Sequence, residues 1–114
     1  MGLDFRHIKG DTFDEVNFEV KINNVAVNLT GAVIKMQLRK DAYDHVTTPA
    51  LSLTSVADAG ITITQPILGK FKINSQVINV DVFTYFYDIQ ITLASGVVKT
   101  YVSGFFDVLV DVSV

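Results

Sequence analysis

The sequence predicts an all-β protein, and three features of the chain support this fold class. No stretch repeats its apolar residues with the 3.6-residue period of an amphipathic helix. β-Branched and aromatic residues dominate the segments between clusters of Gly, Asn, Asp and Pro, as in chains of short strands joined by turns. Within these segments apolar and polar residues alternate, which indicates sheets with one buried and one wet face. At 114 residues and 12.5 kDa, the chain is expected to form one domain over residues 1–114.

The first half of the chain contains two clear strand patterns. Apolar side chains alternate with charged or polar ones over residues 13–22, and the same alternation returns over residues 33–40. Each segment should therefore bury one face in the core. The side chains expected on the buried faces are Val16, Phe18, Val20, Ile22, Ile34, Met36 and Leu38.

The middle of the chain is predicted to contain a loop, a short strand and a hairpin. Residues 40–50 form a polar loop, and residues 50–54 suit a short strand. Residues 60–64 and 69–73 then pair as a hairpin around Pro66. The core candidates of this hairpin are Ile61, Ile63, Phe71 and Ile73.

The last part of the chain is predicted to form a longer hairpin. Residues 74–84 lead to it by crossing between two sheets, with a helical turn at most. If Ser95 and Gly96 are the two loop residues, the loop fixes which residues of the two strands face each other. The resulting register pairs Phe86 with Phe105, Asp88 with Ser103, Ile89 with Val102, Gln90 with Tyr101, Ile91 with Thr100, Thr92 with Lys99 and Leu93 with Val98.

The final strand continues in phase beyond the length of a usual strand, so Gly104 is expected to mark a bend or a β-bulge. Tyr87 shares the phase of Ile89 and should be buried, while Tyr85 is a candidate for a tyrosine corner. Seven to nine short strands without a cysteine pair predict an immunoglobulin-like antiparallel β-sandwich, with a jelly roll or a small barrel as alternatives. The core side of the final strand is expected to carry Phe106, Val108, Val110 and Val112.

One group of side chains is unusual for a solvated sheet. In the expected register Phe86, Tyr101 and Phe105 share the outward face of the final hairpin, and Leu109 follows on that face. A contiguous apolar patch on a soluble protein usually marks a contact with another protein. These four residues are therefore the candidate protein interface.

The sequence offers little material for catalysis or for cofactor binding. It has no cysteine, and its only histidines are His7 and His45. Asp41, Asp44 and His45 share a loop, but a solvated loop is the simpler interpretation, so neither a metal nor a cofactor is expected. A hydrolase that used Asp88 would need a second carboxylate about 5 to 9 Å away, and an outward polar residue is again the simpler interpretation. The chain is therefore not expected to be an enzyme.

Charge and hydropathy argue against several classes of partner. Nine Lys and Arg residues against twelve Asp and Glu residues give a net charge of −3, so nucleic acid is not an expected partner. No apolar stretch approaches the roughly 18 residues of a membrane span, and no membrane partner is expected. The first eleven residues mix acids and bases where a signal peptide has an apolar run, so export by a signal sequence is not expected.

A series of short motifs runs in order through nearly the whole chain. It begins with a Lys-Gly-Asp turn and continues with Leu-Thr-Gly-Ala before a strand that ends in Met-Gln-x-Arg. Tyr-Asp-Ile-Gln-x-Thr, a Gly turn and Lys-Thr follow, and Gly-x-Phe-x-Val closes the series. The matching positions are 9–11, 29–32, 36–39, 87–92, Gly96, 99–100, Gly104, Phe106 and Val108. This ordered set resembles small β-sandwich domains of tailed-bacteriophage structural proteins, above all the N-terminal domain of phage baseplate upper proteins.

The resemblance implies a non-enzymatic structural component of a tailed-phage virion, in the baseplate, the tail, the neck or as a head-decoration module. It implies other virion structural proteins as partners, symmetric assembly as a trimer or hexamer, and localisation in the virion after synthesis in the host bacterial cytoplasm. The baseplate proteins continue into further domains, whereas this sequence ends at Val114, so a stand-alone module is expected. A carbohydrate-binding or receptor-adhesion β-sandwich module that uses the same aromatic residues is the alternative function.

Overall fold

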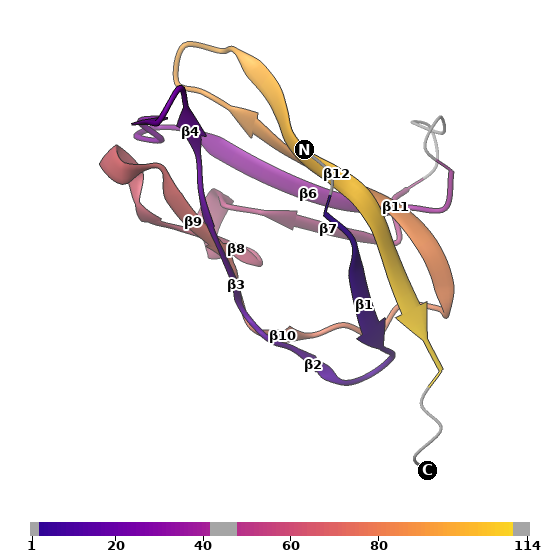
Figure 1. The fold of residues 1–114 in the computed structure, drawn as a ribbon. Helices are drawn as coiled ribbons and strands as arrows, with labels where there is room; N and C mark the ends of the chain where they lie inside the picture. Colours follow the sequence, from indigo (N-terminus) through magenta and orange to yellow (C-terminus); the bar gives the residue numbers. More distant parts are fainter. Residues whose placement is uncertain (1–2, 42–47, 111–114) are drawn as a thin grey trace.

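The protein is all-β in the computed structural model, which describes residues 3–41 and 48–110 (Figure 1). Two 3-10 turns are the only helical segments of this described part. Eight strands have four residues or more, and four have two residues each. The elements are β1 (Phe5–Ile8), β2 (Thr12–Phe13), β3 (Val16–Glu19), β4 (Lys21–Ile22), β5 (Val25–Ala26), β6 (Val33–Arg39), β7 (Leu51–Thr54), η1 (Val56–Asp58), β8 (Ile61–Gln65), η2 (Pro66–Leu68), β9 (Lys70–Ile73), β10 (Gln76–Val77), β11 (Phe83–Thr92) and β12 (Val98–Leu109).

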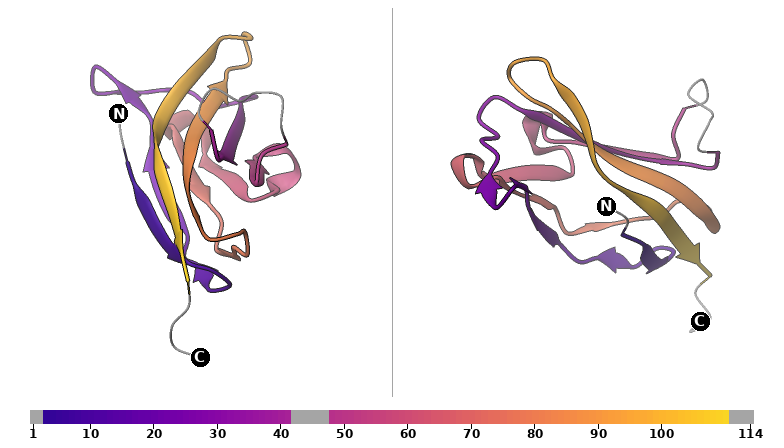
Figure 2. Two further views of the ribbon diagram at one scale, coloured as in Figure 1. Left: turned by 90° about the vertical axis from the view of Figure 1, so that its right-hand side faces the viewer. Right: turned by 45° about the horizontal axis from the view of Figure 1, so that its top comes forward.

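Two sheets form the two layers of the molecule. The larger sheet has five strands in the order β1-β12-β11-β6-β7, and the smaller has three in the order β3-β9-β8. Figures 1 and 2 show the two sheets facing each other, with the pairs β10-β2 and β4-β5 extending the layer of the smaller sheet. All neighbours in these sheets are antiparallel except β1 and β12, which run parallel.

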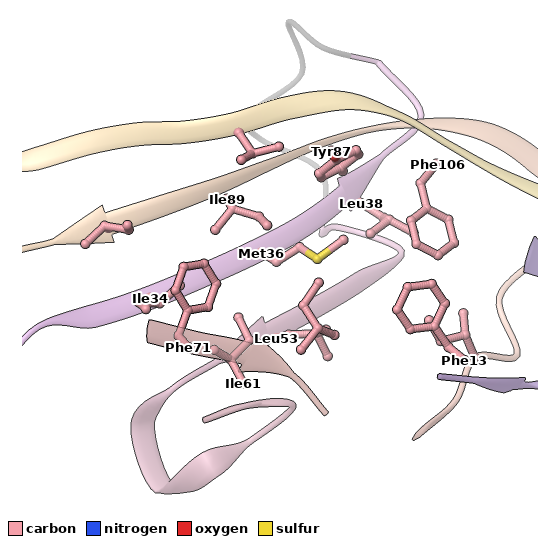
Figure 3. Close-up of a cluster of buried hydrophobic side chains, with 14 of the residues drawn as sticks. Phe13, Ile34, Met36, Leu38, Leu53, Ile61, Phe71, Tyr87, Ile89 and Phe106 are labelled. Atoms are coloured by element: carbon pink, nitrogen blue, oxygen red, sulfur yellow. The ribbon is translucent and has the colours of Figure 1, made fainter. Parts of the chain in front are cut away.

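The core fills the space between the layers because alternate residues of each strand point inward (Figure 3). β6 contributes Ile34, Met36 and Leu38, as the alternation in the sequence predicted, and Phe71 of β9 faces them from the smaller sheet. Burying each such side chain contributes about 1.5 to 3 kcal/mol to the hydrophobic driving force. The predicted core residues that are buried are Val20, Ile34, Met36, Leu38, Ile61, Phe71, Ile73, Tyr87, Ile89, Phe106 and Val108.

The segment 13–22 is not one strand, as the sequence predicted, but three short pieces. Val16 and Phe18 are half-buried, and Ile22 is 62% exposed, so its assignment to the core is wrong. The reason is that the chain leaves the smaller sheet at Val20, whose N–H donates to the carbonyl of Gly69. The β4-β5 hairpin that follows is not part of the three-stranded sheet, and Ile22 there is mostly exposed.

Other expectations for the strands have mixed outcomes. The hairpin of β8 and β9 around Pro66 and the short strand β7 are confirmed. Ile63 is half-buried, and Val110 is 61% exposed rather than in the core. Residues 74–84 cross from one sheet to the other as predicted and contain β10 without a helical turn. Val112 lies outside the described residues.

The register of the β11-β12 hairpin changes once along its length. From Phe83 to Ile89 the pairing follows the prediction, with Phe86 opposite Phe105 and Asp88 opposite Ser103. Beyond Ile89 it shifts by one residue, so that Gln90 pairs with Thr100 instead of Tyr101. The cause is the loop, in which the N–H of Leu93 bonds to the carbonyl of Val97, leaving three loop residues rather than two.

Tyr101 is consequently the extra residue of a β-bulge. The prediction of a bulge or bend at Gly104 placed the irregularity three residues too far along the strand. Gly104 itself pairs regularly with Tyr87.

The N-terminal segment explains why position 104 is glycine. A Cβ atom at Gly104 would lie 2.4 Å from the carbonyl oxygen of Leu3 and 2.7 Å from a carboxylate oxygen of Asp4. The same segment is held by the N–H of Phe105, which donates to Asp4 at 2.9 Å, and by the hydroxyl of Tyr87, which donates to the carbonyl of Leu3. Gly104 therefore allows the N-terminal chain to lie directly against β12 before β1 begins.

Replacing Gly104 with alanine should lower the free energy of unfolding by about 1 to 3 kcal/mol, because the new methyl group must displace the backbone at Leu3. Urea unfolding followed by circular dichroism measures this change. Ser103→Ala, at the exposed neighbouring position, should cost no more than about 0.5 kcal/mol. Equal stability of Gly104→Ala and wild type would contradict the close approach of the N-terminal segment.

Candidate functional site

The outward face of the larger sheet is the best candidate for a functional site. The outward side chains of the adjacent strands β6, β11 and β12 form rows that run across the sheet. Neighbouring residues within a row are about 4.8 Å apart, and successive rows are about 7 Å apart along the strands. One row contains Arg39, Phe86 and Phe105, because Phe86 pairs with both other residues. The next row contains Gln37, Asp88 and Ser103, and the third begins with Lys35 and Gln90.

These rows line a shallow groove of about 550 Å³. Its aromatic part is the pair Phe86 and Phe105, whose ring centroids are 5.2 Å apart and whose side chains are 37% and 46% exposed. In its polar part the guanidinium of Arg39 donates a hydrogen bond to the Gln37 side chain at 3.1 Å. The groove therefore offers an aromatic surface beside a set of polar groups. We call it the outer groove.

Tyr101 is not part of the outer groove, which corrects the predicted four-residue stripe. The bulge turns its ring toward the core, where it lies edge-on to Phe18 and Phe71 at 6.4 and 6.2 Å. Its hydroxyl donates to the carbonyl of Glu19 at 3.0 Å and so ties β12 to the smaller sheet. Tyr101 is a half-buried structural residue.

Leu109 is also separated from the aromatic pair. It lies near the end of β12, opposite Ile8 of β1, and it is half-buried. It does not line the outer groove. Of the four predicted interface residues, the structure therefore brings only Phe86 and Phe105 together.

The residues that β6 adds to the site were not predicted from the sequence. Lys35, Gln37 and Arg39 are outward-facing in the predicted pattern, but β6 and β11 are far apart in the sequence. Nothing in the local pattern shows that these two strands are neighbours. The alternation in each strand was the available signal, and it showed which side chains face outward without showing what lies beside them.

The polar side chains of the groove differ in whether they interact with other residues of the chain. Arg39 and Asp88 both have interaction partners, and Asp88 is half-buried between Gln37 and Ser103 in its row. The side chains of Lys35, Gln90 and Ser103 make no hydrogen bond or ion pair within residues 3–41 and 48–110. Those three groups are free to bind a partner without first breaking an internal contact.

The geometry does not favour hydrolysis by Asp88. Among the described residues that line the groove, Asp88 is the one carboxylate. The two possible partners are engaged elsewhere, since Asp107 accepts a hydrogen bond from Thr84 at 2.9 Å and Asp81 lies 3.7 Å from the amine of Lys9. A pair of carboxylates across a cleft, which glycoside hydrolysis requires, is not formed here by described residues.

Metal binding finds no support in the described part of the chain, which holds no cluster of three or more His, Cys, Asp or Glu side chains arranged as metal ligands. His7 is buried and packs edge-on against Phe13 at 5.5 Å, and its Nε2 lies 3.0 Å from the carbonyl of Asp11. Asp44 and His45 lie outside the described residues. None of the helical segments that the structure describes is long and apolar enough to span a bilayer.

Two buried tyrosines fix the inner side of β11. The hydroxyl of Tyr85 donates to the carbonyl of Asp81 at 2.7 Å, which is the contact predicted for a tyrosine corner. Burial raises the pKa of Tyr87 to about 12, and the negative charge of Asp4 adds to this effect. Burial is likewise the main cause of the raised pKa of Tyr85, followed by the charge of Asp81. These phenols act as structural donors.

Neither a scan against protein-family models nor a search of curated proteins found a match for this chain. The fold defines its class as an all-β protein, and the groove on its larger sheet is the candidate site.

Truncating Tyr101 and Phe105 separately tests which ring faces the core. Tyr101→Ala should lower the free energy of unfolding by about 2 to 3 kcal/mol, whereas Phe105→Ala should cost less than about 1 kcal/mol. Tyr101→Phe keeps the ring and loses the bond to Glu19, so it should cost about 1 kcal/mol. Thermal and urea unfolding give all three values. A larger loss for Phe105→Ala than for Tyr101→Ala would contradict the position of the bulge.

The raised pKa of Tyr87 predicts a loss of stability in alkali. Between its ordinary pKa of 10.0 and its folded value of about 12, unfolded Tyr87 releases its proton while folded Tyr87 retains it. The free energy of unfolding should therefore be independent of this group below pH 10 and fall as the pH rises toward 12. Tyr87→Phe should flatten the decline in urea unfolding measured across this range. If the free energy of unfolding of Tyr87→Phe fell as steeply as that of wild type, the loss of stability would come from other titrating groups.

Proposed function

We propose that the chain is a non-enzymatic structural component of a tailed-phage virion, built as an immunoglobulin-like β-sandwich. Its partners are other virion structural proteins, and it assembles with copies of itself. The observation that carries the proposal is the row of Arg39, Phe86 and Phe105 on the outer groove, where a sheet that faces only water would be polar.

This row has the composition of a protein-binding surface. Aromatic residues and Arg are enriched at protein interfaces, and here they lie side by side on three neighbouring strands. Polar side chains of Gln37, Asp88 and Ser103 border the row along the sheet. A central aromatic group with a polar border is the usual arrangement of such an interface.

The fold supports the virion assignment in a second way. The motifs that resemble phage baseplate domains fall at turns and central strands: residues 9–11 form the β1-β2 turn, residues 29–32 precede β6, and residues 87–92 lie in β11. The tyrosine corner at Tyr85 and the two facing sheets are the supports for an immunoglobulin-like arrangement.

A carbohydrate-binding module is the second candidate, and the groove itself favours it. A pyranose ring has an apolar face that can stack on Phe86 and Phe105, and hydroxyl groups that can bond to free polar groups. Lys35, Gln90 and Ser103 are such groups. The groove volume of about 550 Å³ lies within the range of small-ligand sites.

Replacing Phe105 with aspartate tests the proposed contact. The chain is co-expressed with the products of the genes that flank its own, and the assembled complex is purified and quantified. Phe105→Asp should reduce incorporation at least tenfold, because it buries a charge in the aromatic contact.

The matched control is Val56→Asp, which introduces the same charge at an apolar position of η1 that is 57% exposed. It should be incorporated like wild type. Normal incorporation of a folded Phe105→Asp would reject the outer groove as the contact surface. If that variant also loses binding to a glycan array on which the wild type binds, the second candidate replaces the first.

A further inference from the structure

Eleven of the fifteen large apolar residues that are exposed in the described part of the chain gather at two opposite ends of the molecule. We call these ends the tip and the base, and neither belongs to the outer groove. Figure 1 shows the tip at upper left, where the β4-β5 hairpin, the turn between β8 and β9 and the β11-β12 loop lie, and the base at lower right. The apolar tip residues are Ile22, Val25, Ile67, Leu68, Val97 and Val98, and the apolar base residues are Ile8, Val77, Val82, Phe83 and Val110.

Backbone contacts join two of the three turns of the tip, the β4-β5 hairpin and the turn between β8 and β9. The N–H of Val20 donates to the carbonyl of Gly69, and the N–H of Leu29 donates to the carbonyl of Pro66, both at 2.8 Å. Gly69 has a φ of +68°, and a Cβ atom there would lie 2.5 Å from the carbonyl oxygen of Val20. Only glycine allows the hairpin to approach so closely. The aliphatic side chains of these two turns are therefore presented on an ordered frame, which lowers the entropic cost of binding.

The tip carries net positive charge. Each of its three turns places a lysine next to its apolar residues, namely Lys21, Lys70 and Lys99. Glu19 is the acid among them and lies 3.1 Å from Lys21 and 3.8 Å from Lys70. Three bases against one acid leave a positive surface on a chain whose net charge is −3.

The base carries net negative charge. Its three segments are neighbours, because the N–H of Lys9 donates to the carbonyl of Leu109 and the N–H of Gly10 donates to the carbonyl of Ile78. Across residues 8–11, 77–83 and 107–110 the charged residues are Lys9, Asp11, Asp81 and Asp107. Arg39, Lys40 and Asp41 line a hollow together with Asp81, and Lys40 lies 5.1 Å from the Phe83 ring. With these residues included, three bases stand against four acids, so the base stays negative.

We propose that the tip of one copy of the chain docks on the base of a second copy. Both ends combine exposed apolar side chains with charge, and the charges have opposite sign. Because the two surfaces differ, the contact is head-to-tail, and repeated use of it makes a ring if the rotation closes and a filament if it does not. The proposal specifies the contact between copies within the proposed function, but it concerns a different surface from the outer groove.

A charge exchange tests this contact. The tip variant carries Lys21→Glu and Lys99→Glu, and the base variant carries Asp11→Lys and Asp81→Lys. Each variant alone brings like charges together, so its dissociation constant for self-association should rise at least tenfold in analytical ultracentrifugation. An equimolar mixture of the two variants should restore association, because the reversed tip of one matches the reversed base of the other.

Two control variants distinguish the tip-to-base contact from a contact through the outer groove. Lys35→Glu changes the charge in the outer groove and should associate like wild type, as should Phe105→Asp. Ile67→Asp, at the most exposed apolar side chain of the tip, should weaken association without unfolding the chain. This variant tests the tip even if the doubly charged variants do not fold. A monomeric wild type, or folded single-end variants that associate normally, would overturn the proposal.

Discussion

The antiparallel pairing of β11 with β6 on one side and β12 on the other organises both the core and the outer groove. Because β11 is the central strand of the larger sheet, its alternation sets both faces at once. Tyr85, Tyr87, Ile89 and Ile91 point into the core. The hydroxyl of Tyr85 anchors the crossing loop, and that of Tyr87 anchors the N-terminal segment. Phe86 and Asp88, on the other face, become the middle of the outer groove.

The bulge at Tyr101 shows how one backbone irregularity separates structural from surface roles. The three-residue loop of the hairpin offsets the two strands by one residue, and the bulge removes that offset before Val102. The core side chains of β12 beyond the bulge therefore keep their phase with β11. Tyr101 is turned inward as a result, and it joins the two sheets through Phe18, Phe71 and Glu19. Phe105 stays outward beside Phe86.

The contact regions that we propose lie on different parts of the surface. The outer groove lies on the broad face of the larger sheet, while the tip and the base lie at the two ends of a molecule whose longest extent is 45 Å. A chain that docks by its face and associates by its ends could combine self-assembly with binding to a different partner. The two kinds of contact would not compete for the same residues. Such a division suits a module of a larger symmetric assembly.

The all-β class, the inward alternation of β6 and β11, the hairpin of β8 and β9 and the corner at Tyr85 were predictable from the sequence, because they depend on local spacing along the chain. The remaining features depend on contacts between residues that are distant in the sequence. Arg39 lies beside Phe86 because β6 pairs with β11, a strand far along the chain. The parallel pairing of β1 with β12 brings the N-terminal segment against Gly104, which explains the glycine. Tyr101 points inward because the pairing of β11 with β12 shifts by one residue, which turns its side chain to the other face. The alternation of apolar residues in the sequence does not reveal such a shift.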